Sequence, residues 1–324
     1  MRSKVALLDD YQHVALDAVD WTPVRARADI EVFHENETDQ DLLTERLRPF
    51  DIVVAMRDRT KFTRALLERL PALRLLVQTG LSNASIDLEA ATERGILVCH
   101  TDSLRSTTTE LTWALILGCA RHLTLEDRTI RAGGWQSALG RGVAGRTLSL
   151  LGLGQIGAEV ARIGAAFGMR TIAWSQNLTH DVAARAGVTL VSKEELFRQA
   201  DVLSIHVILS ARTRGLVGSA EFELMRPSSI LVNTSRGPIV DERALLQALK
   251  TRKLSAAGLD VFDQEPLPVD HPLRYLDNVI VTPHIGHVTY DNYSIYFRGV
   301  VEDIIGYLNQ KPLRVLNPEL LNRS

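Results

Sequence analysis

The first hundred residues alternate short apolar runs with segments of helical periodicity. The apolar runs are rich in β-branched residues and are continuous rather than alternating, which is typical of parallel strands covered on both faces. Between them, Thr63 opens a helical pattern that stops before Pro71. This order predicts a doubly wound α/β domain. Its strands are expected within residues 4–10, 30–35, 51–57, 73–80 and 95–100.

A second alternating series of apolar runs begins near residue 147. It predicts six strands, the number in a full dinucleotide-binding sheet. Ahead of this series, the apolar segment 107–123 follows a run of threonines and predicts a buried helix. Residues 289–309 predict an amphipathic helix. The six strands are expected within residues 147–154, 169–174, 201–207, 229–234, 256–262 and 278–284.

Composition is ordinary for a soluble globular protein: of 324 residues, 45% are hydrophobic and 23% are charged. The length is comfortable for two domains. A net charge of −2 without a long basic run argues against a nucleic-acid or membrane-surface role. The longest near-apolar stretch, 111–120, is about half of a membrane span. The short apolar start before Asp9 predicts no secretory signal, so we expect a cytoplasmic protein.

The two cysteines, Cys99 and Cys119, fit neither a disulfide framework nor a metal spacing. They predict buried thiols in a reducing compartment, and no metal site is expected.

A glycine-rich loop follows the first apolar run of the second series. Gly152, Gly154 and Gly157 form G-x-G-x-x-G, and helical periodicity follows directly. Glycine lets the backbone turn tightly and approach a pyrophosphate, which the N–H groups of Gln155 and Ile156 then meet at the helix start. The loop predicts dinucleotide binding. A tight turn without a ligand, and another nucleotide binder such as a methyltransferase, are the alternatives.

The end of the next predicted strand lacks the acid that such a unit usually has. Ser175 stands where an Asp or Glu would bind the ribose 2′-hydroxyl, and Gln176 and Asn177 are also uncharged. Losing the acid forfeits a charge-assisted hydrogen bond of about 1.5–3 kcal/mol. It also removes the repulsion of a 2′-phosphate, but no arginine follows to hold that phosphate. We therefore expect relaxed selectivity, with NAD and NADP both accepted.

Three stretches of the second half place a polar residue near a strand end. NTSRG holds Arg236, GLDVFDQEP holds Glu265, and TPHIGH holds His284. Ligands of open α/β sheets lie beyond the carboxyl ends of the strands. Each residue alone is more simply a surface arginine, a solvated loop acid or a loop histidine. Together, after a nucleotide loop, they predict a cation that holds an electrophile, a general acid/base and its orienting carboxylate.

Four motifs, GLGQIG, NTSRGPIVDE, GLDVFDQEP and TPHIG, occur in an order that resembles the D-isomer-specific 2-hydroxyacid dehydrogenases across nearly the whole chain. The resemblance implies NAD(P)-dependent interconversion of a D-2-hydroxy acid and a 2-keto acid. His284 would donate and accept the proton, with Glu265 as its partner. Arg236 would anchor the substrate carboxylate and carbonyl.

The resemblance also implies two doubly wound parallel-sheet domains. A Rossmann cofactor domain, residues 101–287, would be inserted in a flavodoxin-like substrate domain formed by residues 1–100 and 288–324. The apolar helix 107–123 and the segment near Trp135 would support a homodimer in the family manner.

Further contacts come from the same resemblance. Asp260 would hydrogen-bond the nicotinamide amide, and the loop 78–83 would bind the substrate carboxylate through an anion nest of backbone N–H groups. Ile208 departs from the proline that the family often has. Beyond the glycine loop and residues 175–177, the cofactor would meet His206, Val207, Thr234, Ser235 and Gly286. The substrate would meet Gly80, Leu81, Ser82 and Arg57. Apart from the resemblance, Arg57, Arg59 and Arg105 stand on predicted turns. Each is more simply a solvated charge, and the alternative is that one of them reads a second acidic group on the substrate.

A cofactor-sensing scaffold is the alternative of another class, since the C-terminal-binding-protein corepressors share this fold and motif set. The chain lacks a long disordered or basic tail for partners, which argues against that alternative. A methyltransferase would have no use for Arg236, Glu265 and His284.

Overall fold

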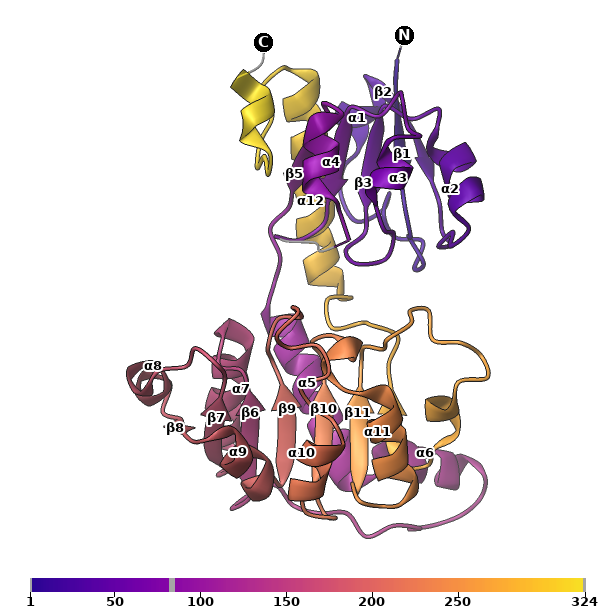
Figure 1. Cartoon of the computed structure of the whole chain (residues 1–324). Helices are drawn as coiled ribbons and strands as arrows, with labels where there is room; N and C mark the ends of the chain where they lie inside the picture. Colours follow the sequence, from indigo (N-terminus) through magenta and orange to yellow (C-terminus); the bar gives the residue numbers. More distant parts are fainter. Residues whose placement is uncertain (1, 82–84, 323–324) are drawn as a thin grey trace. The chain divides into compact units, whose positions relative to one another are not determined.

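The computed structural model describes residues 2–81 and 85–322, which form two compact units (Figure 1). Unit 1 comprises residues 1–104 and 288–324, and unit 2 comprises residues 105–287. Each unit has its own parallel sheet with helices on both faces. The α/β class expected from the continuous apolar runs is confirmed.

Unit 1 is built on a five-stranded sheet in the order β2-β1-β3-β4-β5, which is the flavodoxin-like order. Three of the five strands fall within the expected segments, and β1 and β2 overlap theirs but begin one and two residues earlier. They are β1 (Ser3–Leu7), β2 (Ala28–Val32), β3 (Ile52–Ala55), β4 (Leu75–Gln78) and β5 (Leu97–His100). The helices are α1 (Thr22–Arg25), α2 (Gln40–Leu47), α3 (Arg64–Leu67), α4 (Leu88–Glu93) and α12 (Tyr290–Leu308), with a 3-10 turn η3 (Pro318–Asn322).

The sheet of unit 1 is buried on both sides because successive strand residues point to opposite faces. Val5 and Leu7 lie in the core with α1 and α12, whereas Ala6 and Leu8 lie in the core with α2, α3 and α4. Helix α12 packs on β4 and β5 and starts as expected, since the Thr289 side chain accepts the N–H of the third helical residue. The continuous apolar runs therefore report double coverage, as predicted.

Unit 2 carries a seven-stranded parallel sheet in the order β12-β11-β10-β9-β6-β7-β8. Read from β8, this is the Rossmann order with one further strand, β12. The strands are β6 (Thr147–Leu151), β7 (Arg170–Trp174), β8 (Thr189–Leu190), β9 (Val202–Ile205), β10 (Ile230–Asn233), β11 (Ala256–Leu259) and β12 (Val279–Val281). Six were expected. The prediction missed β8 because two residues are too few to show a period.

The helices of unit 2 also divide between the two faces of its sheet. Helices α5 and α7 share a core with one face, and α9, α10 and α11 share a core with the other (Figure 1). They are α5 (Ser106–Arg121), α6 (Leu123–Arg131), α7 (Gln155–Ala166), α8 (His180–Arg185), α9 (Lys193–Gln199), α10 (Ser219–Leu224) and α11 (Glu242–Lys250), with 3-10 turns η1 (Gly237–Ile239) and η2 (Pro272–Tyr275).

Helix α5 is buried as expected, but the prediction that it continues to residue 123 is wrong. His122 takes a left-handed backbone with φ 53° and ends the helix, and α6 starts at the next residue. Trp113 and Ile116 are buried where α5 meets β10, β11 and α7. A Cβ on Gly258 would lie 2.9 Å from the Leu115 Cβ, so glycine in β11 allows this close helix–sheet packing.

In the described ranges, no helix has both the length and the apolar character needed to cross a membrane. The same residues contain no group of three or more His, Cys, Asp and Glu side chains suited to a metal ion. Cys99 and Cys119 are buried as expected. Burial raises the pKa of each thiol to about 12, so both stay protonated and unreactive near neutral pH.

Candidate active site

The turn between β6 and α7 is the glycine loop. At two of its positions, the neighbouring backbone leaves no room for a side chain. Gly152 has φ 102°, and a Cβ there would lie 2.8 Å from the carbonyl carbon of His206. A Cβ on Gly157 would lie 2.6 Å from the Gly152 carbonyl oxygen. Any side chain at either position would push the β6–α7 turn apart, so these glycines set its shape.

Gly154, the residue before α7, has different surroundings. A Cβ there would meet no heavy atom of the protein within 4 Å, so packing alone does not demand glycine at this position. Gly154 also offers no side chain to the first N–H groups of the twelve-residue helix α7, at Gln155 and Ile156. Open space beside helix N–H donors fits a pyrophosphate that approaches the backbone closely. The loop therefore fits a dinucleotide cofactor.

Ser175 follows β7 directly, at the place where the ribose acid was expected. Its carbonyl accepts the N–H of Leu178 in a turn, at 3.2 Å. Ser175 is half-buried, and Gln176 and Asn177 are exposed. The structure therefore places three uncharged residues at this edge of the sheet.

The end of β9 brings a neutral imidazole to the same edge. The Nε2 atom of His206 lies 2.8 Å from the Ser204 hydroxyl, and burial lowers the pKa of His206 to about 4. Ser235, after β10, donates its hydroxyl to the Val207 carbonyl at 2.6 Å and joins the two strand ends. The Thr234 hydroxyl lies 2.8 Å from that of Thr112 in α5.

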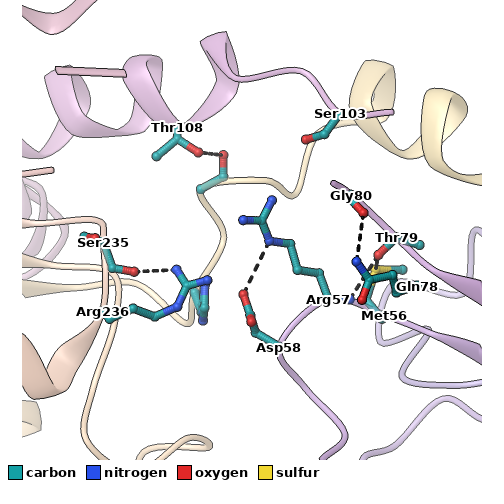
Figure 2. A network of polar contacts seen from close by, with 12 residues as sticks. Met56, Arg57, Asp58, Gln78, Thr79, Gly80, Ser103, Thr108, Ser235 and Arg236 are labelled. Carbon is teal, nitrogen blue, oxygen red and sulfur yellow. Dashed lines mark hydrogen bonds and ion pairs between the residues drawn. The ribbon is translucent and has the colours of Figure 1, made fainter. Parts of the chain in front are cut away.

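Arg236 is carried by a tight turn after β10. The Asn233 side chain spans this turn, since its Nδ2 donates to the Arg236 carbonyl at 3.0 Å and its Oδ1 accepts the Ser235 N–H at 3.0 Å. The Arg236 Nη1 atom donates to the Ser235 carbonyl at 2.6 Å (Figure 2). A Cβ on Gly237 would lie 2.1 Å from the carbonyl carbon of Phe262. Glycine thus brings the Arg236 turn against the segment that carries Glu265.

His284 and Glu265 form a direct pair. His284 Nδ1 lies 2.7 Å from Glu265 Oε2, and the other carboxylate oxygen accepts the Phe262 N–H at 2.9 Å. Because both carboxylate oxygens are engaged, Glu265 has a fixed orientation and holds the Nδ1 side of the ring. The histidine side chain is 19% exposed, which leaves Nε2 as the nitrogen able to exchange a proton with a bound molecule.

Asp260, at the end of β11, holds the turn that bears His284. Its Oδ1 accepts the Thr282 hydroxyl at 2.6 Å and the Ile285 N–H at 2.8 Å, and its Oδ2 accepts the Gly286 N–H at 2.9 Å. Burial raises the pKa of this carboxyl above its ordinary value, and the three hydrogen-bond donors offset only part of that rise. The sequence assigned Asp260 to the nicotinamide amide. The structure shows an internal role as well, and the amide contact stays a prediction.

Thr108 is a residue that the sequence did not single out. It lies in the first turn of α5 and donates its hydroxyl to the Gly286 carbonyl at 3.1 Å (Figure 2). Asp260 therefore binds the N–H of Gly286 and Thr108 binds its carbonyl. No motif marks Thr108, because the contact joins residues 178 positions apart. The run of threonines was the only signal, and it was interpreted as helix capping.

The loop after β4, in unit 1, was expected to bind the substrate carboxylate. Gly80 has φ 83°, and its N–H donates to the Thr101 hydroxyl at 2.9 Å. In this structure the Gly80 N–H thus has an internal partner, and the anion nest around Gly80, Leu81 and Ser82 stays a prediction. Leu81 is 39% exposed, and Ser82 lies outside the described residues.

The three arginines proposed to read a second acidic group differ in their contacts. Arg57 Nε pairs with Asp58 Oδ2 at 3.4 Å (Figure 2), and its Nη1 would lie 3.2 Å from a Cβ on Gly80. Arg59 donates to the Asp9 carbonyl and covers a tyrosine ring at 4.4 Å, so internal contacts hold its guanidinium. Arg105 is exposed at the start of α5. Arg57 thus lies next to Gly80, at the start of the loop after β4.

The chain is similar in sequence and in fold to known proteins. A family model described as D-isomer specific 2-hydroxyacid dehydrogenase, NAD binding domain, matches residues 113–286. A glyoxylate reductase of Aeropyrum pernix is 40% identical over 269 residues, which cover 80% of this chain and 79% of that protein. A D-3-phosphoglycerate dehydrogenase of Methanocaldococcus jannaschii is 40% identical over 256 residues, which cover 78% of this chain and 48% of that protein.

The crystal structure of a phosphoglycerate oxidoreductase from Vibrio cholerae superposes with a TM-score of 0.91 and 37% identity, covering 95% of this chain and 99% of that one. The match thus extends over both units of the fold. The chain belongs to the D-isomer-specific 2-hydroxyacid dehydrogenases, NAD(P)-dependent oxidoreductases that act on CH–OH donors.

Proposed function

We propose that the protein reduces a small 2-keto acid to the D-2-hydroxy acid, and catalyses the reverse oxidation, with His284 as the acid/base. The observation that carries the proposal is the 2.7 Å contact between His284 Nδ1 and Glu265. This pair lies in the same unit as the glycine loop and the Arg236 turn. When bound, the reduced nicotinamide supplies the hydride that adds to the carbonyl carbon.

His284 supplies the proton for this reduction. Negative charge develops on the carbonyl oxygen as the carbon is reduced, and an imidazolium can donate its Nε2 proton to that oxygen. Glu265 stabilises the charged ring and holds it at Nδ1. In the oxidation, the neutral ring removes the hydroxyl proton, and the same carboxylate stabilises the imidazolium that forms.

Arg236 holds the substrate in this scheme. Its planar guanidinium can donate two hydrogen bonds to the carboxylate and carbonyl oxygens of a 2-keto acid. The tight Asn233 turn and the Gly237 contact limit the positions that this side chain can reach.

The cofactor is assigned to unit 2. The N–H groups of Gln155 and Ile156 would hold its pyrophosphate, and residues 175–177 would meet the adenosine ribose. The nicotinamide half would lie along the ends of β9, β10 and β11, beside His206, Val207, Thr234, Ser235, Asp260 and Gly286.

A kinetic screen tests the proposal against the scaffold alternative. The substrates are glyoxylate, hydroxypyruvate, phosphohydroxypyruvate and a longer 2-keto acid, each with NADH and with NADPH. The names of the similar proteins put glyoxylate and the phosphorylated acid first. A dehydrogenase turns over at least one acid with a kcat of about 1 s⁻¹ or more. Binding of reduced cofactor without turnover of any acid would support a cofactor-sensing scaffold instead.

Cofactor choice is expected to depend on residue 175. A Ser175→Asp substitution restores the acid, which gains a charge-assisted bond to the 2′-hydroxyl and repels a 2′-phosphate. We expect the ratio of kcat/KM with NADH to that with NADPH to rise about 10- to 150-fold. Ser175→Ala is the control, and its ratio should stay within about threefold of the wild type. A wild-type preference of about a thousandfold for either cofactor would contradict relaxed selectivity.

Homodimer formation is the second part of the proposal. Helix α6 has no buried residue and exposes Leu123 and Ile130, and the segment that follows exposes Trp135 and Leu139 by 77% and 94%. The Glu126 carboxylate accepts the backbone N–H groups of residues 137 and 138, at 3.0 and 2.6 Å. Exposed apolar side chains on a segment that is held in a defined shape are typical of an interface between subunits.

A charge in this surface is expected to separate the subunits. Leu139→Asp would bury an unpaired carboxylate in the interface, so light scattering after gel filtration should give the mass of one chain. Leu42→Asp is the matched control, because Leu42 is an exposed leucine of unit 1, at 58%. That variant should keep the dimer mass. A Leu139→Asp protein with unchanged mass would remove this surface from the interface.

A further inference from the structure

We propose that His287 positions the imidazole of His284 by fixing the plane of its ring. The proposal rests on the proposed function, in which His284 exchanges the proton. His287 is the last residue of unit 2, stands three residues after His284, and is 7% exposed. Nothing in the assigned chemistry uses it.

The backbone of His284 is held firmly. Its φ of 53° is in the left-handed region, which non-glycine residues rarely adopt unless their surroundings impose it. The His284 N–H donates to the Thr282 carbonyl at 3.0 Å, and Asp260 and Thr108 bind the backbone of the next two residues. These contacts fix the start of the side chain. They do not fix the rotation of the imidazole ring about the Cα–Cβ and Cβ–Cγ bonds.

Glu265 restrains that rotation only in part. A single hydrogen bond holds Nδ1 near the carboxylate, but its length and angle can vary, so the ring can still rock about the Cβ–Cγ bond. The His287 ring supplies the second restraint: the two ring centroids lie 5.6 Å apart, and the ring planes meet at 82°. Edge-to-face packing of this kind is favourable between aromatic rings. With the ring held at Nδ1 and across its plane, Nε2 points in one direction.

The experiment compares two variants of one position. His287→Ala removes the ring, and we expect kcat for keto-acid reduction to fall about three- to tenfold while the KM values for acid and cofactor change less than about twofold. His287→Phe keeps an aromatic ring of similar shape and should restore kcat to within about twofold of the wild type. His271→Ala is the control, because His271 is a half-buried histidine that also pairs with a carboxylate, Glu242, and its loss should leave kcat unchanged.

A second readout is independent of turnover. In nitrogen-15 spectra of the imidazoles, the His284 signals, identified by their loss in His284→Gln, should be single and sharp in the wild type and in His287→Phe. They should broaden or double in His287→Ala. An unchanged kcat and unchanged His284 signals in His287→Ala would overturn the positioning role. So would a phenylalanine variant as slow as the alanine variant, which would show that a nitrogen and not the ring is needed.

The two proposals fail in different ways. If the wild type reduces no acid but the His284 signals respond to His287→Ala, the proposed function fails and the positioning contact stands. If the wild type turns over and neither readout responds, only the role of His287 is lost.

Discussion

The His284→Gln protein is expected to reduce the best keto acid with a kcat at least about 100-fold below that of the wild type. Glutamine keeps a polar side chain that can still reach Glu265, but it cannot give a proton to the developing alkoxide. The Kd for the reduced cofactor should stay within about threefold of the wild-type value, because the substitution leaves the glycine loop unchanged. Stopped-flow reduction and cofactor titration measure the two quantities. A variant with near wild-type turnover would remove His284 from the chemistry.

The pH dependence gives an independent check on the same residue. Reduction requires the protonated imidazole, so its rate should fall as pH rises, and oxidation requires the neutral imidazole, so its rate should rise over the same range. His206 does not contribute to this pH dependence. Burial lowers its pKa to about 4, so its ring stays neutral near neutral pH. In His284→Gln both dependences should disappear.

Arg236→Lys is expected to lose at least about tenfold in kcat/KM. Lysine keeps the charge but not the planar fork, so one charged hydrogen bond of about 1.5–3 kcal/mol is lost to the substrate. Steady-state kinetics with the best keto acid measures the loss.

A matched substitution elsewhere in unit 2 controls for the exchange itself. On the surface, Nη2 of Arg252 donates to both carboxylate oxygens of Asp277, at 2.7 and 2.9 Å. Arg252→Lys should leave kcat/KM unchanged. If Arg236→Lys behaves like this control, Arg236 does not hold the substrate.

Much of the fold could be predicted from the periodicity of the chain. Continuous apolar runs such as those that contain β1 and β9 exist because both faces of a parallel sheet are covered, so the pattern reports the layers directly. Local order explains the successes near the glycine loop too, since strand, turn and helix follow one another in sequence. The strand β8 and the break at His122 were missed because each depends on one or two residues, less than a period.

The candidate site was predictable where chemistry depends on residue type and not where it depends on distant contacts. Arg236, Glu265 and His284 stand in motifs, and the structure brings the last two together. The hydrogen bond from the Gly80 N–H to Thr101, 21 residues away, could not be predicted from the sequence. The second role of Asp260 and the contact of Thr108 likewise come from packing between segments that are remote in sequence.

The route of the chain through the two units has a consequence for synthesis on the ribosome. Unit 2 is a continuous stretch, whereas unit 1 needs α12, which packs on β4 and β5. Until residues 290–308 leave the exit tunnel, Leu75 and Val77 lack the helix that covers them. Domains generally fold as units, and exposed apolar strands invite aggregation. Unit 1 is thus the first to be translated and the last to be completed. The time between its first strands and α12 is when a nascent chain most needs a chaperone.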